Sequence, residues 1–238
     1  QKIHIAKEQA ESILDEITAT IREATKTKLF SYGKIVIIIG ILLSVFQQFV
    51  GINVVLYYAP RIFESMGDVA RDASMLQTIV MGLVNVIFTV VAILTVDKWG
   101  RKPLLITGSI GMAIGMIAIA ILSCFDVISI PALRLFTLLF IILFTASFMM
   151  SWGPICWVYI SELFPNKIRG QAVAIAVAAQ WAANYLISST YPGMMEFSSV
   201  LTYGFYGAMA ILSALFVWKM VPETKGKSLE EIEKVWKK

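Results

Sequence analysis

Uncharged hydrogen-bonding side chains stand out within the apolar stretches of this sequence. The segment SVFQQFVGINVVLYYAP carries Gln47, Gln48, Asn53 and Tyr57 among hydrophobic residues. An amide both donates and accepts hydrogen bonds without presenting a charge, which suits a ligand rich in hydroxyl groups. An anionic ligand would instead require Lys or Arg, and a cation would require Asp or Glu, but the apolar stretches contain none of these. The residue types therefore predict a site for a neutral, hydroxylated molecule.

Three later apolar stretches add polar and aromatic side chains of the same kind. Indole rings stack on apolar C–H surfaces, and the indole N–H donates a hydrogen bond. Amides and indoles together form the lining expected for a sugar. The first stretch has Asn85 near its middle. The second has Trp152 and Trp157 on either side of the Gly153-Pro154 pair, which disturbs a helix. The third has Gln180, Trp181 and Asn184, and the spacing of Gln180 and Asn184 places both on one helix face.

These amides have a second interpretation, because interhelical hydrogen bonds between amides are common in membranes. On an ideal helix Gln48 and Asn53 lie about 140° apart. Gly51 between them allows the helix to kink or unwind, which would turn both side chains toward one cavity. Three amides within seven residues, beside two tyrosines, favour the binding site.

The composition indicates which fold must position these side chains. Of the 238 residues, 58% are hydrophobic and 15% are charged, whereas an ordinary globular domain is about 45–50% apolar and roughly a quarter charged. This excludes a water-soluble enzyme, a disordered chain and a secreted disulfide scaffold. A hydrocarbon core of ~30 Å needs about 20 apolar residues per helix. We expect an all-α membrane protein with a six-span bundle at 31–221 and transmembrane helices at about 35–60, 73–96, 103–125, 135–160, 171–193 and 200–218.

The basic residues indicate the orientation of the spans. When the N-terminus is assigned to one side, all but three of the 20 Lys and Arg residues lie on that side, the exceptions being Arg61, Arg71 and Arg134. The positive-inside rule then places both termini in the cytoplasm. We expect a cytosolic amphipathic helical segment at 1–30 and a cytosolic C-terminal segment with a short helix at 222–238.

Opposite charges gather in the turns on this cytosolic side. Asp97 and Arg101 lie between the second and third spans, Glu162 and Arg169 bracket the turn SELFPNKIRG, and Glu223 follows the sixth span. One interpretation is that they only anchor the topology. The other is a network that ties helix ends together in one conformation and separates in another.

Chemistry other than binding has little support in the sequence. The single His4 lies in a polar segment, and Cys124 and Cys156 lack metal-ligand spacing, so we expect no metal site and no cofactor. An intramembrane enzyme would need a catalytic His, Asp or Glu within the spans, and the spans have none.

The basic residues indicate contact with membrane lipid and not with nucleic acid. A sugar sensor that does not transport and a carrier for another neutral polyol stay open as alternatives.

Six motifs make the chain similar to the C-terminal half of a sugar porter of the major facilitator superfamily. In order, they are QQFVGINVVLYYAP, DKWGRKP, SWGPICW, SELFPNKIRG, AVAAQWAANY and VPETKGKSLEEIE. The combination of SWGPICW with AAQW looks closest to bacterial D-xylose–proton symporters. The resemblance covers essentially the whole chain. It implies one six-helix half of a twelve-span transporter of the bacterial inner membrane, which works by alternating access with an N-terminal half that this chain lacks.

The resemblance also implies roles for individual residues. The proton-linked carboxylate belongs to the other half, so we expect this chain to bind D-xylose or a related pentose or hexose weakly and not to transport alone. A passive sugar facilitator is the alternative to a symporter. The implied sugar-binding residues are Gln47, Gln48, Asn53, Tyr57, Asn85, Trp157, Gln180 and Trp181. The implied cytosolic charge network, which holds the inner gate shut in outward-facing states, is Asp97, Arg101, Glu162, Arg169 and Glu223.

Overall fold

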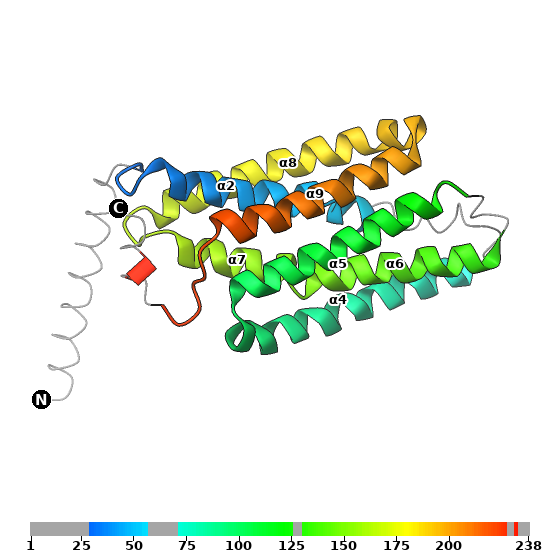
Figure 1. Ribbon diagram of the computed structural model, residues 1–238, viewed down its shortest axis with the longest axis horizontal. Coiled ribbons are helices and arrows are strands. Elements are labelled where there is room, and N and C mark those ends of the chain that lie inside the picture. Colours follow the sequence, from blue (N-terminus) through cyan, green and yellow to red (C-terminus); the bar gives the residue numbers. More distant parts are fainter. Residues whose placement is uncertain (1–28, 57–70, 126–129, 228–230, 233–238) are drawn as a thin grey trace, which may run out of the picture.

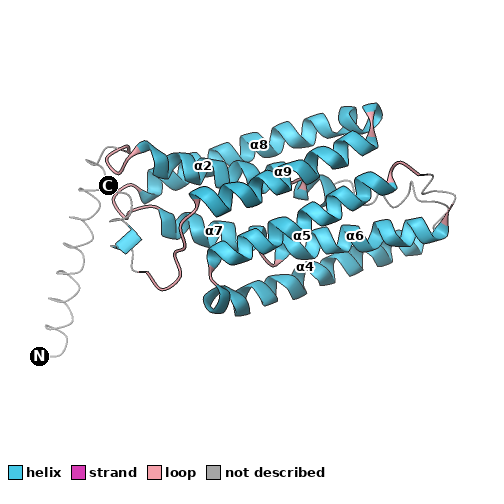
Figure 2. Cartoon of the chain, viewed as in Figure 1, coloured by secondary structure: helices cyan, strands magenta, loops and turns pink. Residues whose placement is uncertain are grey.

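The computed structural model describes residues 29–56, 71–125, 130–227 and 231–232, and these residues form helices and loops without any strand (Figures 1 and 2). A short helical stretch covers 52–56. The expected segment at 1–30 lies almost entirely outside the described residues, as does most of the expected helix within 222–238. The long helices are α2 (Lys34–Phe49), α4 (Arg71–Trp99), α5 (Arg101–Leu122), α6 (Pro131–Met149), α7 (Trp152–Leu163), α8 (Arg169–Phe197) and α9 (Ser199–Met220).

The described residues provide six segments that are long and apolar enough to cross a membrane, which is the expected number. They are Lys34–Leu56, Ile79–Trp99, Arg101–Leu122, Ala132–Leu163, Arg169–Phe197 and Ser199–Met220. Four helices extend past their expected C-terminal boundaries at 96, 160, 193 and 218; they end at Trp99, Leu163, Phe197 and Met220. The expected boundaries exclude charged residues such as Asp97 and Glu162, but the helical backbone continues through them, and α8 also continues past Pro192.

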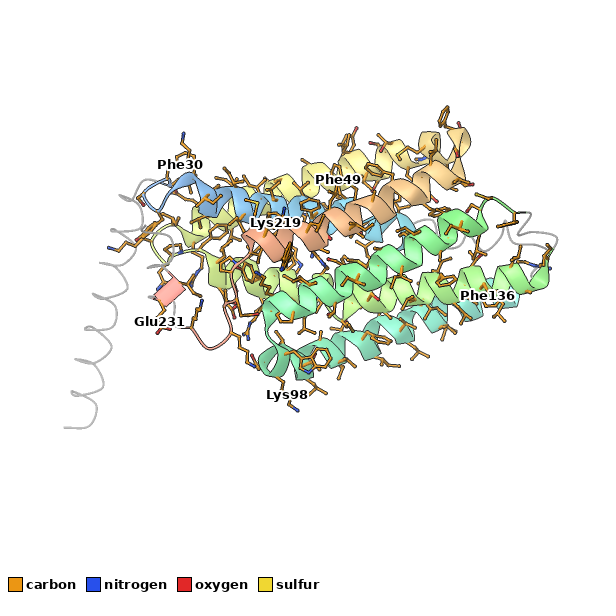
Figure 3. The ribbon with its side chains drawn as sticks, viewed as in Figure 1. Phe30, Phe49, Lys98, Phe136, Lys219 and Glu231 are labelled. Carbon is orange, nitrogen blue, oxygen red and sulfur yellow. The ribbon has the colours of Figure 1, made fainter. Side chains whose placement is uncertain are left out.

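The outward surface of the bundle is apolar. On α4, Leu83, Val86 and Ile93 are more than half exposed, and Phe136 on α6 also points away from the bundle (Figure 3). A soluble monomer rarely exposes so large a contiguous apolar surface. The protein is therefore a multi-pass membrane protein whose exposed helix faces suit contact with lipid.

Small residues allow α5 to pack closely on the end of α6 and the start of α7. A Cβ atom added at Gly108 would collide with Ser151, and one added at Gly111 would collide with Ser147. Helices in a membrane associate largely through such close packing, because lipid is as apolar as their side chains. Figure 1 shows α5 running beside α9, and α2 beside α8, with both pairs in direct contact.

Two helix breaks interrupt the spans at the positions where the sequence predicts a disturbance. Gly51 separates α2 from the helical stretch 52–56 and adopts a φ of +91°, in the left-handed region that favours glycine. A Cβ at Gly51 would lie 2.9 Å from the ring of Tyr206. The second break lies between α6 and α7, where Pro154 has no N–H to donate to the carbonyl of Met150. Both breaks free the chain to turn polar groups inward.

Candidate functional site

A cavity of about 280 Å³ lies between α2, the α6–α7 break and α8. Its volume is close to the lower end of the range of ~300–1,000 Å³ typical of small-molecule sites. None of the described residues that line it carries a charge, so the cavity suits a small neutral ligand. The lining residues are Gln47, Gln48, Ile52, Asn53, Leu56, Phe148, Met149, Gly153, Trp157, Gln180, Trp181 and Asn184.

Gln47 is the centre of the polar lining. Its Nε2 donates to the backbone carbonyl of Trp152 at 2.9 Å, and its Oε1 accepts a hydrogen bond from Nε2 of Gln180. Nε2 of Gln48 lies 3.5 Å from the same Oε1 atom. Because Gln47 is only 3% exposed, these bonds satisfy a buried amide and join α2 to α7 and α8.

Asn53 extends the network along the cavity wall. Its Nδ2 donates to Oε1 of Gln48 at 2.5 Å and lies 3.1 Å from Oδ1 of Asn184 on α8. The same Oδ1 accepts from the Ser188 hydroxyl at 3.1 Å. Gln48 and Asn53 therefore meet despite their separation on an ideal helix, because Gly51 unwinds the turn between them.

Some polar groups of the lining are left for a ligand. Among the described residues, Oε1 of Gln180, Oδ1 of Asn53 and Nδ2 of Asn184 have no hydrogen-bond partner, so both acceptors and a donor are available. The side chains of Trp157 and Trp181 are 42% and 65% exposed while lining the same cavity. The cavity is thus open on one side, with two indole rings at its rim.

The structure gathers most, but not all, of the predicted sugar-site residues. Six of the eight line the cavity. Asn85 does not, because α4 packs on α6 and α7 and not on the walls formed by α2 and α8. The Oδ1 atom of Asn85 is buried, and no described residue hydrogen-bonds it. Tyr57 lies outside the described residues. Asn184, a candidate from its spacing to Gln180 that the resemblance did not include in the sugar site, also lines the cavity.

A cluster of opposite charges ties helix ends together at the end of the bundle where α4 joins α5. Nη1 of Arg101 lies 3.0 Å from Oδ1 of Asp97, and its Nη2 lies 2.9 Å from Oε1 of Glu162 at the end of α7. The second Glu162 oxygen accepts a 2.7 Å hydrogen bond from the hydroxyl of Thr224. The bonds connect the α4–α5 turn, the end of α7 and the segment after α9.

Glu223 completes this cluster by capping α5 from a distant part of the chain. Its two carboxylate oxygens accept the backbone N–H groups of Arg101 at 3.1 Å and Lys102 at 3.0 Å. The first N–H groups of a helix have no partner within it, and a negative charge there is favoured by the helix dipole. Gly100, with a φ of +95°, makes room for the carboxylate, since a Cβ there would lie 2.7 Å from Oε2 of Glu223.

Arg169 lies apart from the other four residues of the predicted network. It begins α8, and its Nε donates back to the carbonyl of Phe164 at 3.2 Å. Its Nη2 is buried without a partner among the described residues. Thr224, which the sequence did not single out, instead bonds Glu162. A hydroxyl in a surface segment carries no pattern that would distinguish it from ordinary polar residues.

In the described part of the chain, six apolar helices and an amide-lined cavity define an integral membrane protein with a candidate site for a neutral polar ligand. The sequence profile of the sugar (and other) transporter family matches residues 2–236, and the chain belongs to that family. Its architecture is that of the major facilitator superfamily.

Individual relatives share this sequence closely. The chain is 50% identical to the D-xylose-proton symporter of Escherichia coli K12 over 97% of its own length and 50% of the relative. It is 45% identical to the glucose facilitated diffusion protein of Zymomonas mobilis, over 88% of the chain and 44% of the relative. Both relatives are transport proteins and not enzymes, and this chain belongs to the same transporter family.

A solved structure confirms the fold. The proton:xylose symporter XylE bound to 6-bromo-6-deoxy-D-glucose matches with a TM-score of 0.79 and 47% identity, over 94% of this chain and 49% of that one. The chain spans about half the length of the curated relatives it matches.

Proposed function

We propose that this chain is the C-terminal, sugar-binding half of a proton symporter for D-xylose or a related pentose or hexose. One observation carries the proposal: uncharged amides from α2 and α8 meet two indole rings around a single cavity. Hydroxyl groups of a sugar match amide donors and acceptors, and its C–H faces match indole rings. Recognition is the only chemistry required, since no bond is made or broken.

In this proposal a sugar enters by exchanging hydrogen bonds. Its hydroxyls bind the available oxygen of Gln180 and the available amide nitrogen of Asn184, and they replace the contact between Gln47 and Gln180. Each such bond contributes only ~1 kcal/mol after water is displaced. The resulting affinity is modest, which allows a carrier to release its cargo.

The relatives support the proton-coupled version. The E. coli relative is named a D-xylose-proton symporter and covers nearly the whole chain. None of the described lining residues is acidic, and the proposal assigns the proton-binding carboxylate to an N-terminal half that packs against the open side beside Trp181. The complete protein then has two six-helix halves and works by alternating access between them.

The charge cluster serves as the cytosolic gate in this proposal. Arg101, Glu162 and Glu223 hold the ends of α5 and α7 and the chain after α9 together, while the remaining buried nitrogen of Arg169 is available to a carboxylate of the other half. Basic residues such as Lys98 and Lys219 lie toward this same end (Figure 3). With both termini on that side, the gate faces the cytoplasm of a bacterial inner membrane.

Uptake by a complete transporter carrying this chain tests the proposal. In proteoliposomes, an inwardly directed proton gradient should drive accumulation of radiolabelled D-xylose. Gln47→Ala or Gln48→Ala should weaken sugar binding about fivefold, the value of one lost hydrogen bond. Gln171→Ala removes an exposed amide of α8 outside the cavity and should leave binding unchanged. Unchanged affinity in both cavity variants, or no uptake of any pentose or hexose, would refute the assignment.

A passive sugar facilitator is the second candidate, because the Zymomonas mobilis relative is named a facilitated diffusion protein. The same vesicles separate the two mechanisms. Sugar that equilibrates at the same rate with and without the proton gradient, and never accumulates, indicates a facilitator. Binding without any uptake indicates a sensor that does not transport.

A further inference from the structure

Trp152 is buried beside the cavity without lining it. Its side chain has no exposed surface, and its Nε1 donates to the hydroxyl of Ser109 at 2.7 Å and to the carbonyl of Leu105 at 3.1 Å. Both acceptors belong to α5. The indole therefore fixes the first residue of α7 to a neighbouring helix.

The acceptor that holds the indole is itself held in place. The Ser109 hydroxyl donates to the carbonyl of Leu105 at 2.8 Å and lies 2.9 Å from the hydroxyl of Ser213 on α9. Ser109 and Ser213 are fully buried. A buried network in which every member has a partner is rigid, because breaking one bond strands a polar group in an apolar interior.

The backbone of Trp152 carries this anchoring to the cavity. Its carbonyl accepts the 2.9 Å hydrogen bond from Nε2 of Gln47, and the carbonyl of Gly153 lies 3.5 Å from the same nitrogen. Trp152 directly follows the break at 150–151, so no preceding helical turn fixes its position. The indole bond to α5 supplies that constraint instead.

We propose that Trp152 is a positioning residue for the sugar site. The hydrogen bond from its indole to Ser109 fixes the position of the Trp152 backbone carbonyl. Gln47 donates to this carbonyl, and the bond orients the Gln47 side chain so that its Oε1 atom faces Gln180 and the cavity as an acceptor. The inference rests on the proposed sugar-binding function. It assigns a role in affinity to a residue that no ligand touches.

The first test removes the indole N–H and keeps an aromatic ring. In the complete transporter, Trp152→Phe should raise the dissociation constant and the KM for D-xylose about three- to tenfold, the effect of one misplaced hydrogen bond. The maximal rate per folded transporter should stay within about twofold, because the N–H acts only through Gln47. Ser109→Ala should produce a smaller rise, of about two- to threefold, because the carbonyl of Leu105 still accepts from the indole.

A double-mutant cycle separates positioning from a general effect on packing. In a Gln47→Ala background, Trp152→Phe and Ser109→Ala should cause no further loss of sugar affinity. In an Asn184→Ala background, where no hydrogen bond to Gln47 is removed, both should cause their full effect. The same loss in both backgrounds, or no loss from either variant alone, would overturn the proposal. If the unmutated transporter binds no sugar, the proposed function itself fails, which is a different result.

Discussion

Replacing Glu223 by Gln tests whether a carboxylate from one end of the chain holds the start of α5. Oε1 of Glu223 accepts the N–H of Arg101, and Oε2 accepts the N–H of Lys102. The Oε1 atom also accepts the N–H groups of Thr224 and Lys225, both at 2.9 Å. In Glu223→Gln, an amide nitrogen replaces one of the two acceptors and the negative charge is lost.

The expected magnitude follows from the contacts that are lost. Loss of a side-chain cap at a helix N-terminus costs about 0.5–2 kcal/mol. Removing a negative charge from that position costs about 0.3–1 kcal/mol more. Because the amide oxygen of Gln still accepts hydrogen bonds, we expect the lower part of the summed range, about 1–2 kcal/mol, which corresponds to a roughly five- to 30-fold larger population of the opened helix end.

Amide hydrogen exchange followed by mass spectrometry measures this opening directly. The amides of Arg101 and Lys102 should exchange about five- to 30-fold faster in the variant, whereas amides in the buried middle of α5, around Met112, should not change. Glu196→Gln, an exposed residue near the end of α8, makes the same change of charge elsewhere and serves as the control. Unchanged exchange at Arg101 and Lys102 would refute the capping role of Glu223.

Two further substitutions test other parts of this turn and the segment after α9. Gly100→Ala should lower stability by about 1–3 kcal/mol, because Ala is strained at a φ of +95° and its Cβ would crowd Glu223. Thermal unfolding in detergent measures this loss, and Gly82→Ala, which meets no neighbouring atom, should cause none. Thr224→Val removes a hydrogen bond to Glu162 and should make the backbone around 224–227 more sensitive to proteolysis, while α5 stays intact. Equal melting temperatures for the two alanine variants would contradict the first expectation, and an unchanged cleavage rate the second.

The sequence predicted the cavity residues because their polarity conflicts with their surroundings. An amide such as Gln47 inside an apolar span needs a polar partner, whatever the packing of the helices. Gly51 added the information that Gln48 and Asn53 could share one side. Membrane spans are also easy to recognise, since length and polarity together define them.

Other features depend on how the helices pack, which a single sequence does not state. Asn85 has the same polarity as the cavity amides, but the position and rotation of α4 place it elsewhere. Trp152 and Trp157 look equivalent around one helix break, yet only Trp157 lines the cavity. The contacts of Glu223 with α5 join residues more than a hundred positions apart, and no local sequence pattern predicts them.

Mutual hydrogen bonding among the cavity amides has a consequence for the speed of the transport cycle that we propose. Because Gln47 bonds Gln180 and Asn53 bonds both Gln48 and Asn184, several of these amide groups have a partner within the protein whenever no sugar binds them. When a sugar leaves, the amides bond one another again, and these bonds replace some of those lost to the sugar. We therefore expect the sugar to stay bound only briefly. In the proposed transporter, this arrangement favours fast cycling over tight retention of the sugar.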